Sequence, residues 1–355
     1  MKRKLALLYA IISTILLAAG FLLVFYFSWN AGVWETVDCI IGLVLGFVLS
    51  PVLHELGHVS FARMADMDYV YVKMFCFRVK VQNGKKKFAF VSPFAPDETQ
   101  VLPLRGGNME KRAKLYTLGG IIFGGAFLLV VLGCAVVLTC MGYTDYQLWG
   151  MVPYATYLFF LNALPFEYAG GKTDMLVYLG IRKGEAAERN MIAAMEIHGQ
   201  LSEGKSFSEI DERYYYDVPQ LCEDEPLFAV MLDLRYRYHL EKEEVEKAAN
   251  CLNRLVGIQE YLSASENEKI AAELVYVHSL RKDKESAEAC GKCCKEYLKE
   301  DTVTAKRILA AYSATLENSE TLEILLQQAK QALKKEPIKG VRKFEQKLIE
   351  RISLV

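Results

Sequence analysis

The chain has 355 residues, enough for two domains, and 52% of them are hydrophobic. Its 42 basic and 43 acidic residues give a formal net charge of −1, which argues against nucleic acid as the main partner. The nine cysteines are odd in number and scattered, so they predict no disulfide framework and indicate a reducing compartment.

The first apolar run extends from Leu5 to Phe27 without a charged residue. A membrane-spanning helix needs about 20 mostly apolar residues, so this run is predicted to span a bilayer. The basic residues before it also fit a signal peptide. However, the run exceeds the roughly 7–15 apolar residues of such a peptide, which favours a membrane anchor.

Three further apolar runs predict three more spans, at about residues 39–62, 115–141 and 148–167. Lysine and arginine gather before the first run, between residues 63 and 114, and again after residue 171. Because basic loops stay in the cytoplasm, this pattern places both termini there. We therefore expect an integral, multi-pass protein in contact with the lipid bilayer, most simply of a bacterial cell membrane.

The second run contains His54-Glu55-Leu56-Gly57-His58, which fits the pattern H-E-x-x-H. Residues four apart share one face of a helix, so both imidazoles can bind a single Zn²⁺. Glu55 is placed to act as general base towards water, whose pKa zinc lowers to about 7. Gly57 is small enough to let another helix approach closely.

A charged side chain inside a span costs at least about 2.5–3.5 kcal/mol, so two histidines and a glutamate there need compensation, which a metal ion provides. The alternative is that the span ends at Leu53 and the motif is an ordinary helix end at the membrane surface. In the third run, Gly119-Gly120 and Gly124-Gly125 favour close helix packing, with or without a role at the site.

The fourth run ends with Asn162-Ala-Leu-Pro165, and Gly170-Gly171-Lys172-Thr173-Asp174 follows it. Together with the H-E-x-x-H motif, they resemble the site-2 protease family of intramembrane zinc metalloproteases over about residues 38–180. That family takes a third zinc ligand, an Asp, from a later helix preceded by Asn-x-x-Pro. The resemblance implies that Asp174 is the third ligand of one zinc ion per chain, with Asn162 and Pro165 supporting the site.

The sequence departs from the family pattern, in which the Asp lies closer to the Pro and is followed by Gly. Here the interval is longer and Met175 follows the Asp, which indicates a divergent branch. Glu167 lies nearer to Pro165 and is the rival third ligand. Asp174 could instead cap a helix that starts at Met175, although Thr173 could provide that cap.

A β-hairpin insertion is predicted at about residues 69–104. Tyr, Val and Phe dominate residues 70–82 and 85–91, and Asn83-Gly84 between them is a strong two-residue turn signal. A hairpin near the site could receive an extended substrate as an added strand, which exposes the peptide bond. It could equally only cover the site.

From residue 181 onwards, amphipathic helical patterns separated by short polar breaks predict a cytoplasmic, all-α domain over residues 181–355. The helices are expected at about residues 243–255, 268–280, 284–298, 304–316 and 319–333. Tyrosines recurring before breaks suggest either a tetratricopeptide-like array or a plain bundle. Either form would serve as a surface for a protein partner. Cys290-x-x-Cys293-Cys294 lacks a partner pair at zinc-finger spacing, so a metal or redox role is the weaker reading.

The expected fold is thus mainly α, with a transmembrane core over residues 1–180, about four spans and a small β insertion. The expected activity is a zinc-dependent endopeptidase that cuts membrane-spanning or hydrophobic peptides near the cytoplasmic face. Both parts of the predicted site, residues 54–58 and 162–174, lie at cytoplasmic ends of predicted spans. The alternative is a catalytically silent membrane scaffold with a helical interaction domain.

Overall fold

The computed structural model of the chain describes residues 2–82, 85–93, 95, 97–168 and 171–352. It divides into two compact units. Unit 1 comprises residues 1–102 and 108–188, and unit 2 comprises residues 103–107 and 189–355. Most of the described chain is helical, as the apolar runs and amphipathic patterns of the sequence predict, with a four-stranded sheet and a two-stranded sheet in unit 1.

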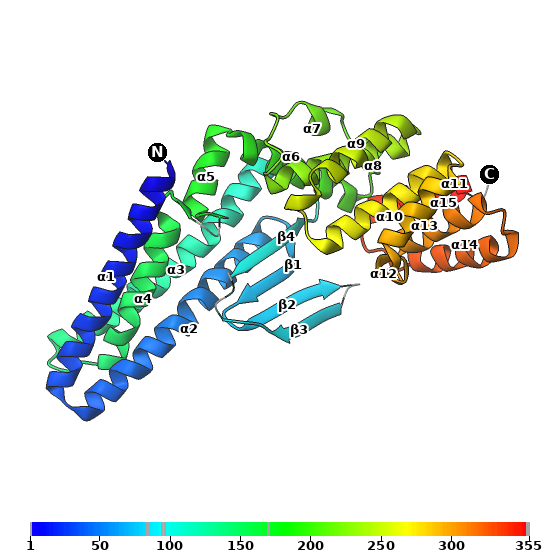
Figure 1. Cartoon of the computed structure of the whole chain (residues 1–355). Helices are drawn as coiled ribbons and strands as arrows, with labels where there is room; N and C mark the ends of the chain where they lie inside the picture. Colours follow the sequence, from blue (N-terminus) through cyan, green and yellow to red (C-terminus); the bar gives the residue numbers. More distant parts are fainter. Residues whose placement is uncertain (1, 83–84, 94, 96, 169–170, 353–355) are drawn as a thin grey trace. The chain divides into compact units, whose positions relative to one another are not determined.

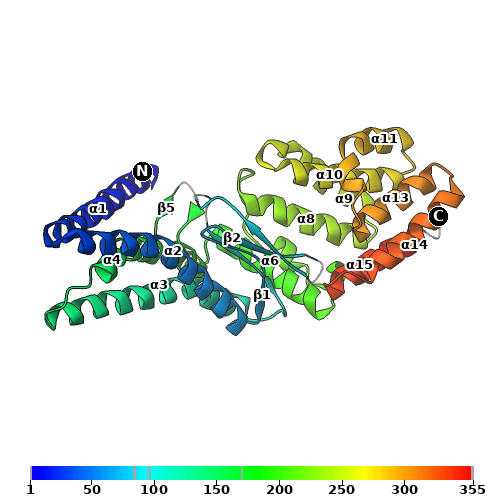
Figure 2. The same cartoon turned by 90° about the horizontal axis from the view of Figure 1, so that it is seen from below.

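Unit 1 is built on four helices that lie side by side (Figures 1 and 2). They are α1 (Lys2–Ala31), α2 (Val33–Met64), α3 (Met109–Cys140) and α4 (Tyr146–Ala163). Residues 28–38, which lie between the first two predicted spans, are helical on both sides of Gly32. Gly32 has a φ of 155°, and a Cβ there would lie 2.4 Å from Glu35 Oε2, so glycine suits this tight connection.

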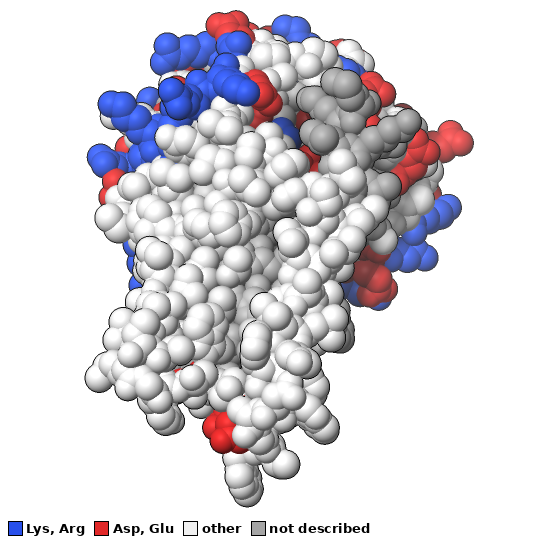
Figure 3. Space-filling model, turned by 90° about the vertical axis from the view of Figure 1, so that its left-hand side faces the viewer, with Lys and Arg blue, Asp and Glu red and all other residues white. Residues whose placement is uncertain are grey.

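Three of these helices, α1, α2 and α3, are long and apolar enough to cross a membrane. Figure 3 shows a broad face of the molecule that is largely without charged side chains. Exposed apolar residues of α1 and α3 include Leu16, Leu22, Leu129 and Val137. A surface of this kind is suited to lipid rather than to water. Helix α4 has only 18 residues, among them Gln147, Pro153 and Asn162, and it is not one of the three candidate spans, so the predicted fourth span stays a prediction.

Glycines set the distances between these helices. A Cβ at Gly57 would lie 2.3 Å from the Gly119 carbonyl oxygen, and one at Gly119 would lie 2.5 Å from the Gly57 carbonyl oxygen. The backbones of α2 and α3 therefore touch at this point. At the start of α3, the buried Arg112 guanidinium donates to the carbonyls of Ala65 and Asp66, the two residues that follow α2. These hydrogen bonds satisfy carbonyl groups at the C-terminal end of α2.

The insertion between α2 and α3 lies close to the predicted range of 69–104 but contains more strands than the predicted hairpin. It forms a four-stranded sheet in the order β3-β2-β1-β4, with β1 (Met67–Met74), β2 (Phe77–Gln82), β3 (Lys85–Phe90) and β4 (Glu98–Pro103). The predicted strand over residues 70–82 is in fact two strands, separated by a turn at Phe75, which has a φ of 52°. Strands β2 and β3 pair antiparallel as expected. The Asn83-Gly84 turn lies outside the described residues.

A short segment connects α4 to the end of unit 1. Strands β5 (Glu167–Tyr168) and β6 (Gly171–Lys172) pair antiparallel, and α5 (Asp174–Lys183) follows directly. The Thr173 side chain caps α5 by accepting from the amide of Leu176, and it also donates to the Leu164 carbonyl. This double contact fixes where the first residue of α5 stands relative to the end of α4.

Unit 2 is helical apart from short connections, and consecutive helices pair: α8 with α9, α10 with α11, and α13 with α14. The predicted helix at 284–298 is broken at Cys294 into α11 and α12. The segment 103–107, before α3, joins this unit through the Gly107 amide, which donates to Glu196. The helices are α6 (Ala186–Glu203), α7 (Arg213–Tyr216), α8 (Pro226–Glu241), α9 (Val245–Gly257), α10 (Ala264–Leu280), α11 (Lys284–Cys293), α12 (Lys295–Leu298), α13 (Val303–Thr315), α14 (Ser319–Leu333) and α15 (Lys339–Ile352), with single 3₁₀ turns at Phe207–Glu209 and Gln259–Tyr261.

A buried ion network ties three of these helices together. Arg307 on α13 is fully buried and donates to Glu273 on α10 at 2.8 Å and to Glu345 on α15 at 2.7 Å. Its guanidinium carbon also lies 4.1 Å from the ring centre of Tyr276. A sequence pattern cannot show such a network, because a charged residue in an amphipathic helix is normally assigned to the face exposed to solvent.

Replacing Arg307 with alanine would remove the cation to which the buried carboxylates of Glu273 and Glu345 are hydrogen-bonded. We expect Arg307→Ala to destabilise this part of unit 2 by about 3–5 kcal/mol, the usual cost of breaking a buried ion pair. Hydrogen exchange of the α10 and α13 amides in the full-length protein measures the loss. Arg213→Ala removes an exposed pair with Asp211 and should leave the exchange unchanged.

Candidate metal centre

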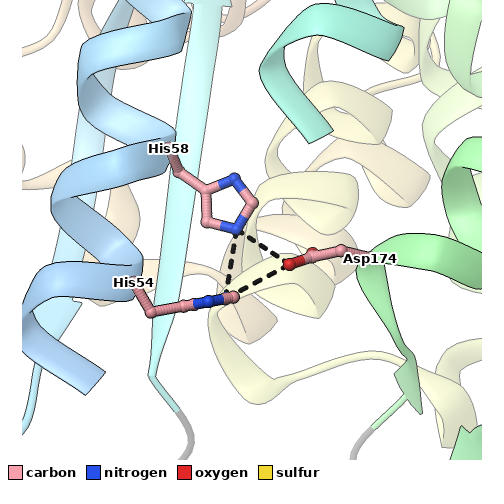
Figure 4. Close-up of side chains that lie close together, drawn as sticks. All are labelled: His54, His58 and Asp174. Atoms are coloured by element: carbon pink, nitrogen blue, oxygen red, sulfur yellow. Dashed lines mark hydrogen bonds and ion pairs between the residues drawn. The ribbon is translucent and has the colours of Figure 1, made fainter. Parts of the chain in front are cut away.

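The two histidines of the H-E-x-x-H motif lie on one face of α2 and are both buried. The Nε2 atoms of His54 and His58 lie 3.3 Å apart (Figure 4). Hydrogen bonding orients the second ring, because His58 Nδ1 lies 3.1 Å from the Tyr116 carbonyl oxygen on α3. A proton on Nδ1 donates to that carbonyl and leaves a lone pair on Nε2, which is the arrangement of a metal-binding imidazole.

Asp174, the first residue of α5, meets the two histidines from across the bundle (Figure 4). Its Oδ2 atom lies 3.2 Å from the Nε2 atom of each. The carboxylate is not occupied with capping α5, because Thr173 does that. Oδ2 is buried without a well-formed hydrogen bond among the described residues, so this polar atom still lacks a full partner.

The three donor atoms form a nearly equilateral triangle with sides of 3.2, 3.2 and 3.3 Å. A tetrahedral ion with ligands at about 2.0 Å has about 3.3 Å between neighbouring ligand atoms. The triangle therefore has the size of one face of a zinc tetrahedron. Two imidazoles and one carboxylate are also a donor set typical of catalytic zinc, which keeps its fourth position open.

Glu55 lies beside this triangle but is not part of it. Its Oε2 atom accepts a hydrogen bond of 2.5 Å from the Thr99 hydroxyl, on strand β4. The Tyr116 hydroxyl in turn donates to the Thr99 carbonyl at 2.5 Å. Thr99 and Tyr116 were not predicted from the sequence. No spacing signal could find them, because they lie 44 and 61 residues from Glu55 in the chain.

A cavity of about 690 Å³ opens over the triangle and over Glu55. Its volume falls in the range of ordinary ligand-binding clefts. Apolar side chains such as Leu158, Leu161 and Val177 form one part of its wall, and Glu98 and Thr99 of β4 form another. An extended peptide in this cavity would lie between helix side chains and a strand.

The other residues singled out by the sequence are placed as follows. Asn162 is buried and lines the cavity, but its amide donates to the Leu158 carbonyl of its own helix. Pro165 is exposed after the end of α4. Glu167, the rival third ligand, is exposed on β5 and is absent from the cluster that His54, His58 and Asp174 form among the described residues.

Gly120 allows α3 to pass directly over the metal-binding face of α2. A Cβ there would lie 2.5 Å from both His54 Cε1 and His58 Nε2. We expect Gly120→Ala to displace the imidazoles and to lower zinc binding at least about tenfold, as misplacing a ligand does. Zinc titration of purified protein measures this. Gly133→Ala, on the same helix with open space around it, is the matched control, and equal zinc binding by both variants would contradict the prediction.

The cysteines of Cys290-x-x-Cys293-Cys294 do not form a metal site among the described residues. Burial raises the pKa of the Cys294 thiol to about 11, and burial also raises the pKa of Cys290. These thiols are protonated at neutral pH and are weak nucleophiles and ligands. The structure thus gives no support to the metal or redox reading of this motif.

Comparison of the chain with protein families, with curated proteins and with solved structures found no match. Any statement about activity therefore rests on the residues and on their geometry.

Proposed function

We propose that this chain is a zinc-dependent endopeptidase of the membrane, with His54, His58 and Asp174 as zinc ligands. The observation that carries the proposal is the triangle of two imidazole nitrogens and one carboxylate oxygen, sized for a tetrahedral ion. The site-2 protease pattern in the sequence agrees with this assignment. One zinc ion per chain is expected.

When bound, zinc would supply Lewis acidity, activating water and polarising the carbonyl of the peptide bond. Glu55 is the general base: it takes a proton from the attacking water and passes it to the leaving amine nitrogen. Thr99 holds one oxygen of Glu55, and Tyr116 fixes the ring of His58 through its carbonyl. These contacts orient the base and one ligand before a substrate binds.

The substrate class follows from the surroundings of the site. The histidines lie on a helix apolar enough to span a membrane, and apolar residues of α4 and α5 line the cavity. We therefore propose membrane-spanning or hydrophobic peptides as substrates, cut near the cytoplasmic face, which the distribution of basic residues assigns to this end of α2. A helical peptide bond is shielded by its own hydrogen bonds, so the bond must be presented in extended form.

A catalytically silent scaffold is the competing function, and metal analysis with comparative proteomics separates the two. Purified protein should contain about one zinc ion per chain. In a strain that carries the Glu55→Gln variant, the membranes should accumulate at least one intact protein that the wild-type strain cleaves. Protein without zinc, or identical membrane proteomes, would favour the scaffold.

A further inference from the structure

Strand β4 is fixed in unit 1 from three directions. Lys73 on β1 is 1% exposed and donates to Asp97, directly before β4, at 2.8 Å. Asp97 also accepts from the amide of Phe75 at 2.8 Å. From the helical side, the Tyr116 hydroxyl donates to the Thr99 carbonyl. This strand is thus a firm support and not a loose cover over the cavity.

Thr99 uses both of its oxygens in this arrangement. Its carbonyl accepts from Tyr116, so that carbonyl is already engaged before a peptide could pair with it. Its hydroxyl donates to Glu55 Oε2 at 2.5 Å, and within the described part of the chain no other side chain is hydrogen-bonded to Glu55. The orientation of the buried carboxylate therefore depends on one hydroxyl group.

Tyr116 connects this contact to the metal-binding face. Its carbonyl lies 3.1 Å from His58 Nδ1, and its ring centre lies 5.2 Å from that of His58. One residue of α3 therefore contacts both a proposed ligand and the strand that holds the proposed base. A shift of β4 would move the carboxylate of Glu55 relative to His58.

We infer that Thr99 is a positioning residue for Glu55 and that Tyr116 sets the position of Thr99. This inference rests on the proposed endopeptidase function. A hydrogen bond to a buried charged group holds that group in one orientation. Loss of the bond from Thr99 to Glu55 should therefore lower kcat and leave the affinity for the peptide unchanged. Strand β4, which forms one wall of the cavity, is thereby part of the catalytic arrangement.

Thr99→Val removes the hydroxyl while keeping the shape and β-branching of the side chain. We expect kcat to fall about 10–100-fold, with KM changed by less than about threefold and zinc content still near one per chain. Thr99→Ser restores the hydroxyl and should recover most of kcat. Tyr116→Phe, which keeps the carbonyl next to His58, should lower kcat by a smaller factor.

The probe is a fluorogenic peptide spanning the bond of a protein that accumulates in Glu55→Gln membranes, assayed with full-length protein in phospholipid vesicles. Thr139→Val is the matched control, since this hydroxyl lies on α3 about 28 Å along the helix from Gly120. Unchanged kcat in Thr99→Val, or loss of zinc from it, would overturn the positioning role while wild-type cleavage still upholds the proposed function. Wild-type protein without zinc and without cleavage would overturn the function itself.

Discussion

Glu55→Gln is expected to retain zinc and to lose peptide cleavage by a factor of about 10²–10⁴, the usual contribution of a general base. Glutamine has the same shape as glutamate, and its carbonyl oxygen can still accept the hydrogen bond from Thr99. It cannot take a proton from water at neutral pH. The three proposed ligand atoms are untouched, so zinc content should stay near one per chain.

Two measurements on the same preparation check this result: elemental analysis for zinc and cleavage of the peptide probe in vesicles. A structural role for Glu55 would change both, through lost zinc or poor folding, whereas a base changes only cleavage. Leu56→Ala is a suitable control, because Leu56 is adjacent on α2 but is 38% exposed and does not line the cavity. Full activity of Glu55→Gln would contradict the mechanism.

Local patterns in the sequence predict much of this structure because they depend on neighbours along the chain. The spacing of His54 and His58 places them on one helical face, and the apolar runs give the positions of α1, α2 and α3. The five helical ranges predicted between residues 243 and 333 lie close to helices of unit 2 for the same reason, except that the range 284–298 is broken at Cys294. No ranges were predicted for α6, α7, α8 and α15.

Features that depend on distant residues could not be predicted in this way. The sheet has four strands instead of two for two reasons: the predicted strand 70–82 is divided by the turn at Phe75, and β4, with the sequence Glu-Thr-Gln-Val-Leu-Pro, lacks a clear alternation of polar and apolar residues. The contacts of Thr99 with Glu55 and of Arg307 with Glu345 join residues 44 and 38 positions apart.

The resemblance to site-2 proteases is what favoured Asp174 as the third zinc ligand. Spacing alone left Asp174 and Glu167 open as third ligand, and it also allowed Asp174 a capping role. In the structure, Thr173 caps α5, Glu167 is exposed, and the Oδ2 atom of Asp174 completes the triangle. Which of the two carboxylates lies near His54 and His58 depends on the pairing of β5 with β6, which places the start of α5 near α2. Such a contact between distant segments cannot be predicted from a local sequence pattern.

Asp174→Asn should therefore reduce zinc affinity at least about 100-fold, more than the 10–100-fold that loss of a supporting residue typically causes. The amide keeps the size of the side chain but is neutral and a poor zinc ligand, so His54 and His58 alone must hold the ion. Competition with a chromophoric chelator measures the affinity. The Thr173 cap stays intact, so α5 should still form.

Glu167→Gln is the matched control, since it makes the same carboxylate-to-amide change only seven residues earlier in the chain. Its side chain is exposed on β5 and lies outside the described cluster, so its zinc affinity should equal that of the wild type. The reverse result, with zinc lost from Glu167→Gln and kept in Asp174→Asn, would move the third ligand to β5. Equal affinity in all three proteins would mean that the two histidines bind zinc without a carboxylate, and the triangle would lose its role in the proposed function.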